Sequence, residues 1–316
     1  MTPSVHVRAP CRLHFGLFGF GRSSGPQWGG VGVMVEPPAV EVTIEAADEF
    51  STSGSLGQRT EQFARSAIRE WQLAALPACH IRVASPPEHT GLGIGTQLGL
   101  SIAAGLRRFL ELPDLTAEAL AASVGRGRRS AVGTHGFLSG GLIVDAGKES
   151  GQTLGTLSER VALPAEWRFV LVTTGAERGL SGNTEADAFA RLPPVPGEVT
   201  QELWRLTEDE MLPAVKRADC AAFGEAVYHF GRFAGECFAA VQGGPFASDE
   251  IGHLIDALRN HGVDGVGQSS WGPTVFAIVP NDAEARAFSD WLHTDMRVPR
   301  DTITVARANN FGAAIH

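Results

Sequence analysis

The chain has 316 residues, of which 43% are hydrophobic and 19% are charged, and its formal net charge is −9. This length and composition predict a globular protein of one large or two modest domains, and the acidic balance argues against nucleic-acid binding, which usually shows as a basic face. No stretch approaches the roughly 18 apolar residues of a membrane span, no signal peptide is evident, and the four cysteines have no metal-ligand spacing. We therefore expect a cytoplasmic protein with reduced thiols.

The first half of the chain shows strands and short helices in alternation. We expect a strand in VHVRAPCRLHFGLF, then a glycine-rich loop, then two short strands broken at Pro37 and Pro38. Apolar residues at helical spacing predict helices over residues 60–73 and 98–110, and a third helix begins at Thr116, a predicted N-cap. CHIRVASPP and FLSGGLIVDAG are expected to be strands.

A polar, glycine-containing stretch between Gly147 and Leu163 separates the two halves. Beyond it we expect helices over residues 217–241, 249–261 and 282–293, and strands in WRFVLVTT, VGQSSWGPTVFAIV and DTITVARA. Interleaved strands and helices with short connections favour an α+β fold over a doubly wound parallel sheet. The predicted domains are residues 1–163 and 164–316.

Residues 91–96, GLGIGT, form a glycine loop in front of a predicted helix. Gly91, Gly93 and Gly95 allow successive backbone amides to converge on one anion, and the positive end of the helix dipole adds to the attraction. Thr96 can cap the helix and Gln97 can reach an anion. Glycine turns that open helices are common, and the loop matches neither the dinucleotide fingerprint nor GxxxxGK[ST], so other residues must support a phosphate site.

The dense basic run of the chain is RGRR, at residues 126–129. Arg126, Arg128 and Arg129 can neutralise a phosphate, whereas a solvated surface cluster is the alternative explanation. No Asp or Glu lies between Gly125 and Gly141. The segment therefore offers no carboxylate that could act as a catalytic base.

These motifs together resemble the GHMP superfamily of small-molecule kinases, whose phosphate loop is usually written PxxxGLGSSA and here reads PPEHTGLGIGTQLG. The chain is more similar, within that superfamily, to the β-ribofuranosylaminobenzene 5′-phosphate synthase family of methanopterin biosynthesis. The family's marks RLHFGL, GLGIGTQL, GRGRRSAVGTHGFLSGGLIVD, GLSGNTE and QSSWGPT occur in order from Arg12 to Thr274. The sequence departs at Ile94, where the family usually has Ser, and so lacks one hydroxyl in the loop.

The resemblance implies a ribosomal protein S5-like N-terminal domain, a ferredoxin-like C-terminal domain, a site between them, and a homodimer. The family's reaction joins phosphoribosyl pyrophosphate to 4-aminobenzoate or 4-hydroxybenzoate and releases pyrophosphate and carbon dioxide, with Mg²⁺ and no organic cofactor. The kinases commonly carry SGxD with Asp as the base, but residues 130–133 here read SAVG. Loss of carbon dioxide itself restores the aromatic ring, so alignment and charge stabilisation suffice without a strong protein base.

The resemblance and the motifs together give three groups of candidate site residues. The candidate catalytic residues are Arg129, Ser130, His135 and Arg12. The residues expected to bind the phosphates are Gly91, Gly93, Gly95, Thr96, Gln97, Arg126 and Arg128, with Thr96 as the nearest candidate metal ligand. The residues expected at the aromatic acid are His14, Ser181, Glu185, Ser269, Ser270 and Trp271.

Several of these residues also have a purely structural explanation. Arg12 suits an ion pair on its strand, His135 suits a buried, hydrogen-bonded histidine, and Glu185 suits the first turn of a helix. Trp271 beside a glycine turn is typical of a core residue. Two rival functions also stay open: an ATP-dependent small-molecule kinase, and a non-catalytic anion-binding relative, which the change at Ile94 favours.

Overall fold

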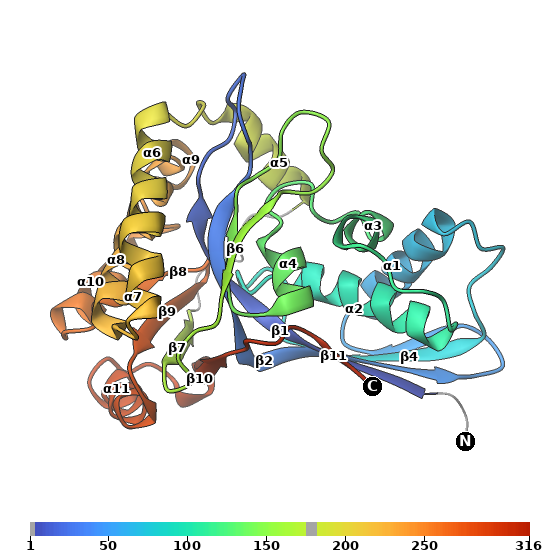
Figure 1. Ribbon diagram of the computed structural model, residues 1–316. Helices are drawn as coiled ribbons and strands as arrows, with labels where there is room; N and C mark the ends of the chain where they lie inside the picture. Colours follow the sequence, from blue (N-terminus) through green and yellow to red (C-terminus); the bar gives the residue numbers. More distant parts are fainter. Residues whose placement is uncertain (1–3, 175–181) are drawn as a thin grey trace.

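The structure is a computed structural model that describes residues 4–174 and 182–316 (Figure 1). Its strands are β1 (Ser4–Leu17), β2 (Gly30–Ala46), β3 (Ser51–Gly54), β4 (Cys79–Ala84), β5 (Leu142–Asp145), β6 (Leu157–Val161), β7 (Arg168–Thr173), β8 (Gly265–Gln268), β9 (Thr274–Val279), β10 (Ile303–Ala308) and β11 (Ala314–Ile315). Strands and helices are mixed along the chain, which confirms the predicted α+β class.

The helices are α1 (Gly57–Glu70), α2 (Ile94–Phe109), α3 (Ala117–Ser123), α4 (Val132–Ser139), α5 (Gly182–Arg191), α6 (Gly197–Arg205), α7 (Leu212–Lys216), α8 (Cys220–Glu236), α9 (Ala239–Gln242), α10 (Asp249–Asn260) and α11 (Asp282–Thr294). A π-helical turn, η1 (Leu206–Met211), precedes α7, and a 3-10 turn, η2 (Arg300–Thr302), precedes β10. Thr116 caps α3 as predicted, because its side chain accepts a hydrogen bond from the backbone N–H of Ala119.

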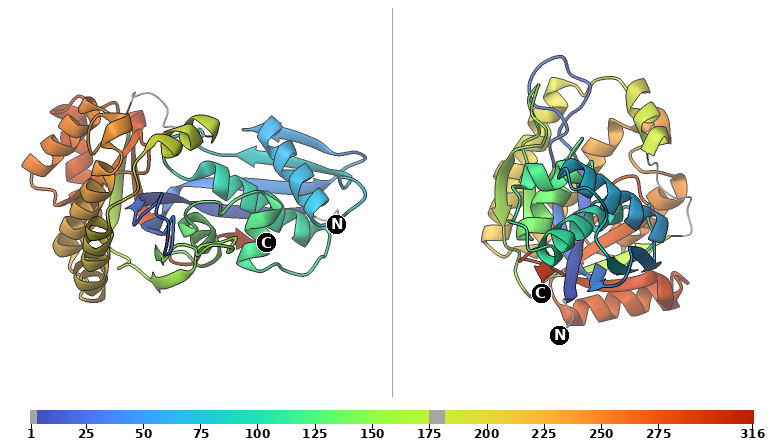
Figure 2. Two further views of the ribbon diagram at one scale, coloured as in Figure 1. Left: turned by 90° about the horizontal axis from the view of Figure 1, so that it is seen from above. Right: turned by 90° about the vertical axis from the view of Figure 1, so that its right-hand side faces the viewer.

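The described strands form one sheet around the long antiparallel pair β1 and β2. The main path of the sheet is β11-β1-β2-β10-β7-β9-β8, while β4 and β5 pair with other stretches of β2. Figures 1 and 2 show β1 and β2 running between helices α1 to α4 and the helices around β8 and β9. The predicted boundary at residues 163/164 falls between β6 and β7, and β10 and β11 bring the chain back to β2 and β1.

Strand β2 continues through the proline pair at positions 37–38, so the expectation of two short strands was wrong. Pro10 of β1 pairs with Ala39, whereas Cys11 pairs with Val35. The residues between Val35 and Ala39 therefore form a bulge opposite β1. A bulge accommodates prolines because a residue outside the ladder does not need a backbone N–H to donate.

Several helices differ from the sequence-based expectation. The single helix expected over residues 217–241 is divided into α8, which ends at Glu236, and the short α9, and helices α5, α6 and α7 were not predicted. The segment Val132–Ser139 is helix α4, so the strand expected from Phe137 onward begins only at Leu142. Glycine explains how this helix fits, because a Cβ atom at Gly136 would lie 2.2 Å from the sulfur of Met34 on β2. Helix α2 begins at Ile94, four residues earlier than predicted, directly after the glycine loop.

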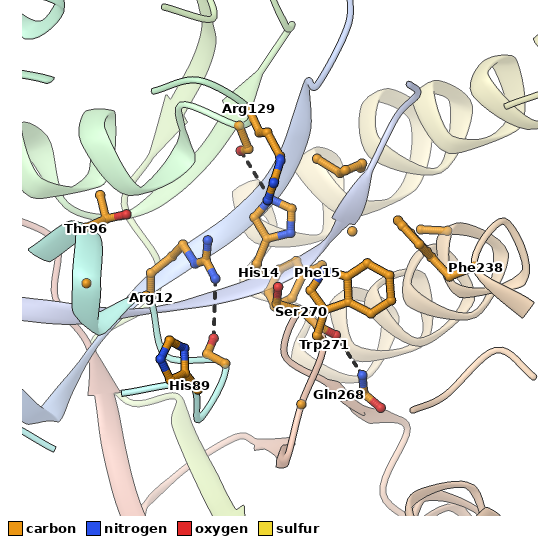
Figure 3. A pocket seen from close by; sticks show the side chains of 18 of the residues that line it. Arg12, His14, Phe15, His89, Thr96, Arg129, Phe238, Gln268, Ser270 and Trp271 are labelled. Atoms are coloured by element: carbon orange, nitrogen blue, oxygen red, sulfur yellow. Dashed lines mark hydrogen bonds between the residues drawn. The ribbon is translucent and has the colours of Figure 1, made fainter. Parts of the chain in front are cut away.

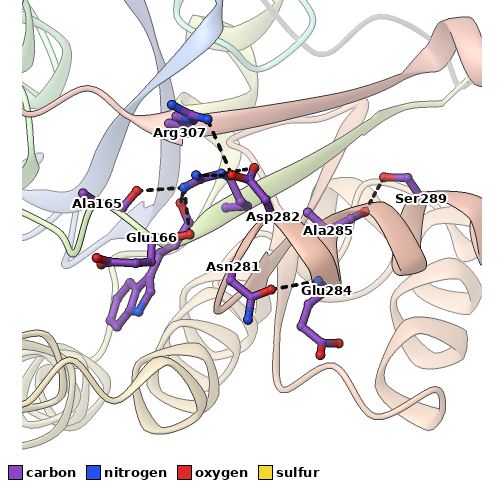
Figure 4. A network of polar contacts seen from close by, with 10 residues as sticks. Ala165, Glu166, Asn281, Asp282, Glu284, Ala285, Ser289 and Arg307 are labelled. Atoms are coloured by element: carbon purple, nitrogen blue, oxygen red, sulfur yellow. Dashed lines mark hydrogen bonds and ion pairs between the residues drawn. The ribbon is translucent and has the colours of Figure 1, made fainter.

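Arg168 of β7 joins β7 to the start of α11 through Asp282, and Figure 4 shows Arg307 pointing toward the same Asp282. The Arg168 side chain is 7% exposed, and its Nε and Nη2 atoms each donate to a carboxylate oxygen of Asp282 at 2.6 Å. Arg307 of β10 approaches the same carboxylate at 3.5 Å. Hydrogen bonding from Arg168 lowers the pKa of Asp282. The network ties β7, β10 and the start of α11 together.

Candidate active site

A pocket of about 740 Å³ lies where segments from both halves of the chain meet. It is lined by parts of β1, the glycine loop, the loop at residues 125–130, α5, the α8–α9 region and the turn at residues 268–272. Figure 3 shows Arg12 on one side of this pocket and Phe238 and Trp271 on the other. Segments that are remote in sequence therefore converge on one cavity.

The backbone of the glycine loop adopts conformations that residues with a side chain rarely adopt. Gly91 has a φ of +84° and Gly93 a φ of +71°, both in the left-handed region. A Cβ atom at Gly91 would lie 2.3 Å from the carbonyl oxygen of Ser269. Gly93 is the N-cap of α2, and the first residues of the helix line the pocket. Backbone N–H groups in a first helical turn lack partners within the helix, so this end suits an anion.

Two predicted phosphate residues lie differently from expectation. Thr96 does not cap α2, because Gly93 occupies the N-cap position without a side-chain hydrogen bond, but Thr96 does line the pocket. Gln97 is buried, and its Nε2 atom donates to the carbonyl oxygen of Gly133 at 2.9 Å. Gln97 therefore joins α2 to α4 and is not among the pocket-lining residues.

Ile94, the departure from the family's usual Ser, is 2% exposed. It belongs to the main apolar core together with Leu92 and Leu98. The isoleucine thus contributes hydrophobic contacts to the base of the glycine loop, where the family's residue would contribute a hydroxyl.

Five arginines line the pocket near the glycine loop, namely Arg12, Arg59, Arg126, Arg128 and Arg129. The arginine loop, defined here as residues 125–129, is fixed from behind by Lys148, whose Nζ atom donates to the carbonyl oxygens of Gly127 at 3.2 Å and Arg128 at 2.5 Å. Gly127 adopts a φ of +75° in this loop. The three arginines of the RGRR run therefore line the pocket, and Arg128 is also exposed at the surface.

Glu88 is the acidic residue among the described residues that line the pocket. One of its carboxylate oxygens lies 3.7 Å from Nε of Arg59. Across the described residues, no group of three or more His, Cys, Asp or Glu side chains is arranged to hold a metal ion. In the same part of the chain, no helix combines the length and apolarity needed to cross a membrane.

The turn that contains QSSWGPT sits against the glycine loop. The Ser269 hydroxyl is buried, donates to the carbonyl oxygen of Gly91 at 2.7 Å and accepts from the backbone N–H of His14 at 3.0 Å. Ser269 thus acts as a link between three segments, while its neighbours Ser270 and Trp271 line the pocket.

His135, like Gln97 and Ser269, is a candidate that the structure places outside the pocket lining. Its Nε2 atom lies 2.8 Å from the carbonyl oxygen of Gly155, in agreement with the structural alternative. Of the remaining candidates, Glu185 falls within α5 and Ser181 lies outside the described residues.

An aromatic wall, defined here as Trp28, Phe189, Phe238 and Trp271, closes the other end of the pocket. The rings of Phe238 and Trp271 lie 4.8 Å apart between centroids, and those of Trp28 and Phe189 lie 4.9 Å apart, both in edge-to-face geometry. Sequence analysis found only Trp271 of this set. Trp28 lies in a glycine-rich loop, Phe189 lies on α5, and Phe238 lies in the turn between α8 and α9, so no local pattern distinguishes them.

Asp145 is the second feature that sequence analysis missed. This buried residue ends β5, and its carboxylate accepts hydrogen bonds from the backbone N–H of Ala131 at 2.6 Å and from the Ser130 hydroxyl at 3.3 Å. The segment after the arginine loop contains no acid of its own, but the fold supplies one from a strand. The available signal was an Asp directly after the apolar run LIV.

Solved structures with the same arrangement of elements belong to small-molecule enzymes. Mevalonate pyrophosphate decarboxylase from Streptococcus pyogenes aligns with a TM-score of 0.71, at 11% identity and 98% coverage of both chains. Homoserine kinase from Cytophaga hutchinsonii aligns with a TM-score of 0.63, at 15% identity, over 99% of this chain and 97% of that one. Residues 211–295 match the family model described as GHMP kinases C terminal. The chain therefore shares the fold of these enzymes and carries a segment that matches the C-terminal part of the GHMP kinases.

Two relatives narrow this class. The chain is 31% identical to β-ribofuranosylphenol 5′-phosphate synthase from Methanothermobacter thermautotrophicus over 88% of this chain and 89% of the relative. It is 32% identical to the synthase of the same name from Archaeoglobus fulgidus, over 96% of this chain and 97% of the relative. The chain belongs to the β-ribofuranosylphenol 5′-phosphate synthase family, which confirms the resemblance drawn from the sequence motifs.

Proposed function

We propose that this enzyme condenses phosphoribosyl pyrophosphate with 4-hydroxybenzoate or 4-aminobenzoate, forming a β-C-riboside 5′-phosphate and releasing pyrophosphate and carbon dioxide. The observation that carries the proposal is a single pocket with a cationic glycine-loop end and an aromatic end. One end suits a phosphorylated sugar and the other suits a benzoate ring. Both reactants can therefore be held together, which is the main requirement for a bimolecular reaction of this kind.

The cationic end is suited to the leaving group. As the bond between the anomeric carbon and pyrophosphate breaks, negative charge accumulates on the pyrophosphate oxygens. Arg12, Arg126 and Arg129 line the pocket with the amide-rich start of α2, and fixed donors of this kind stabilise developing charge without reorganisation. Mg²⁺ usually binds through phosphates and one or two protein oxygens, so Glu88 and Thr96 would hold it here, and the ion would neutralise pyrophosphate.

The aromatic end is suited to the nucleophile. The benzoate carbon that bears the carboxylate attacks the anomeric carbon, and the new C–C bond replaces the C–O bond to pyrophosphate. The bond to the carboxylate then breaks, carbon dioxide leaves, and its bonding electrons return to the ring. Rings of the aromatic wall offer edge and face contacts that hold a flat substrate in one orientation. No strong base is required at the reacting carbon.

The identity of the aromatic acid is supported by the relatives. The names of the synthases from Methanothermobacter thermautotrophicus and Archaeoglobus fulgidus specify a ribofuranosylphenol product. A phenol product requires a hydroxyl group para to the reacting carbon, so we propose 4-hydroxybenzoate as the preferred acid.

Asp145 does not support the rival kinase function. A kinase base must reach the hydroxyl of its acceptor. Asp145 is fully buried, is not among the residues that line the pocket, and has both carboxylate oxygens occupied by backbone N–H donors from Ala131 and Gly147. Its role is better explained by its hydrogen bonds to Ser130, Ala131 and Gly147, which hold these segments in place.

Pyrophosphate release in three mixtures tests the proposal. Enzyme with Mg²⁺ and phosphoribosyl pyrophosphate is incubated with 4-hydroxybenzoate, with 4-aminobenzoate, or with no acid, and a parallel mixture contains ATP and an alcohol. We expect pyrophosphate only where an aromatic acid is present, and faster with the hydroxy acid. ADP formation in the ATP mixture, with no pyrophosphate in the others, would replace the proposal with a kinase.

A further inference from the structure

The carboxylate of Asp145 is an acceptor for three donors. Its Oδ2 atom accepts from the backbone N–H of Ala131 at 2.6 Å and from the hydroxyl of Ser130 at 3.3 Å, and its Oδ1 atom accepts from the backbone N–H of Gly147 at 2.9 Å. Burial raises the pKa of Asp145, and these hydrogen bonds act in the opposite direction. Backbone donors on both oxygens favour the ionised carboxylate, which can only accept.

The Asp145 carboxylate, which can only accept, fixes the direction of the hydrogen bonds at Ser130. A serine hydroxyl has one hydrogen to donate and two lone pairs to accept with. The backbone N–H of Val132 donates to it at 3.2 Å, and the hydroxyl hydrogen goes to Asp145. The third neighbour of the oxygen is Nε2 of His14, at 3.1 Å. Because the hydroxyl hydrogen is already committed, Nε2 of His14 must be the donor and carry the proton.

The ring of His14 is held in a form that leaves its other nitrogen as an acceptor. His14 is 5% exposed, and burial, followed by the charge of Arg12, lowers its pKa, so the ring is neutral. A Cβ atom at Gly30 would lie 3.2 Å from the Cε1 and Nε2 atoms, so the glycine makes room for this edge of the ring. Within the described residues, Nδ1 has no protein hydrogen-bond partner, and His14 lines the pocket (Figure 3).

We propose that Asp145 and Ser130 are positioning residues that hold His14 as the neutral Nε2–H tautomer, so that its Nδ1 atom accepts a hydrogen bond from a substrate group in the pocket. The acidic residue missing from the sequence motif is thus present in the fold, but it acts two hydrogen bonds away from the substrate. Neither Asp145 nor Ser130 needs to exchange a proton with the reactants.

The substrate group follows from the proposed function, on which this step rests. Attack by the benzoate ring draws electrons from its para hydroxyl or amino group, and the hydrogen on that group becomes a stronger donor. An acceptor placed on this hydrogen stabilises the charge as it develops. When carbon dioxide leaves, the ring regains its electrons and the hydrogen stays with the substrate. The step therefore needs no net proton transfer.

The tautomer is tested by nitrogen NMR on the full chain labelled with ¹⁵N-histidine. The chain has ten histidines, and the His14 signals are assigned by their loss in His14→Gln. We expect wild-type His14 to show a protonated Nε2 and a bare Nδ1, Ser130→Ala to show a mixture of tautomers, and Ser130→Thr, which keeps a hydroxyl, to restore the wild-type pattern. Ser139→Ala, a control on α4, should leave the signals unchanged. A proton on Nδ1 in the wild type, or an unchanged pattern in Ser130→Ala, would overturn the proposal.

The acceptor role is tested by equilibrium binding of 4-hydroxybenzoate and its methyl ether, which has no para donor. We expect the wild type to bind the phenol roughly tenfold more tightly, as one hydrogen bond predicts. His14→Asn, which can place an oxygen near the position of Nδ1, should keep this preference, whereas His14→Gln should lose it. A His14→Gln variant that still preferred the phenol over the methyl ether as strongly as the wild type does would overturn the acceptor role. Neither measurement needs turnover, so an enzyme that formed no product would contradict the proposed function while the NMR pattern still decided the tautomer.

Discussion

The guanidinium of Arg129 lies over the ring of Phe189, with Cζ 4.9 Å from the ring centroid. Arg129 belongs to the arginine loop and Phe189 to the aromatic wall, so this contact joins the two ends of the pocket. In the proposed reaction, a cation at this junction would be close both to the aromatic acid and to the departing pyrophosphate. The cation–π attraction also holds the guanidinium against the ring face, which favours a fixed role in charge stabilisation.

Arg129→Ala should lower kcat by about 10²- to 10³-fold, because it removes a fixed donor from developing negative charge. Arg129→Lys should recover only part of the loss, since an ammonium group lacks the planar, forked geometry of a guanidinium. The assay is steady-state pyrophosphate release. Arg65→Ala is the matched control, because Arg65 is exposed on α1 and pairs with Glu61. Near-normal activity of Arg129→Ala would remove the arginine loop from the mechanism.

Phe238→Leu should weaken binding of the aromatic acid without a comparable effect on phosphoribosyl pyrophosphate. Phe238 contacts both Phe189 and Trp271, and aromatic pairs contribute about 0.5–1.5 kcal/mol beyond their buried area. We therefore expect the KM for the acid to rise about threefold to tenfold. Phe233→Leu, at a 42% exposed position on α8, serves as the control. Equal increases in both KM values would indicate a general disturbance instead of an aromatic subsite.

Ile94→Ser, which introduces the family's usual residue, should destabilise the protein by about 3 kcal/mol, because Ile94 is 2% exposed within the core. Ile94→Val should cost about 1 kcal/mol. Denaturant unfolding measures both values. An Ile94→Ser protein as stable as the wild type and with faster turnover would mean that the hydroxyl belongs to the reaction and that the isoleucine has impaired it.

The buried His14 predicts a specific dependence of stability on pH. Burial and the nearby Arg12 lower the pKa of folded His14 below its ordinary value of 6.5. In acid, the unfolded chain therefore binds a proton that the folded chain does not, and stability falls as pH drops below about 6.5. We expect the free energy of unfolding of the wild type, relative to that of His14→Gln, to decrease as the pH is lowered from about 8 to about 5. A difference that stays constant over this range would contradict a neutral, buried His14.

Local sequence patterns predicted the parts of the fold that local physics controls. The glycine loop was found because left-handed residues such as Gly91 require glycine, and Thr116 was found because helix N-caps need a side-chain acceptor. The course of β2 was missed because a proline pair normally ends a strand, and only the bulge opposite β1 makes it acceptable. Helix α4 was missed because its short apolar segment has no clear helical period.

The residues of the candidate site likewise fall into those that sequence patterns predicted and those that depend on tertiary contacts. The arginine loop was predicted because a dense basic run stands out in an acidic chain, and Arg12 was predicted from the family motif RLHFGL. The pocket brings them together. Asp145 and Phe189 were not predicted, because an Asp that ends a strand and a Phe on a helix acquire a role only through tertiary contacts. His135 was selected for its place beside the missing acid, but the helical turn of α4 directs its ring to Gly155.

The most direct test of the central claim is the ratio of carbon dioxide to pyrophosphate in one reaction. Phosphoribosyl pyrophosphate and Mg²⁺ are mixed with 4-hydroxybenzoate labelled at its carboxyl carbon, and both products are counted over time. A decarboxylating condensation predicts equal amounts of the two, no release without the acid, and release of both about 10²- to 10³-fold slower from Arg129→Ala. Pyrophosphate without labelled carbon dioxide, or release that does not depend on the acid, would contradict the account.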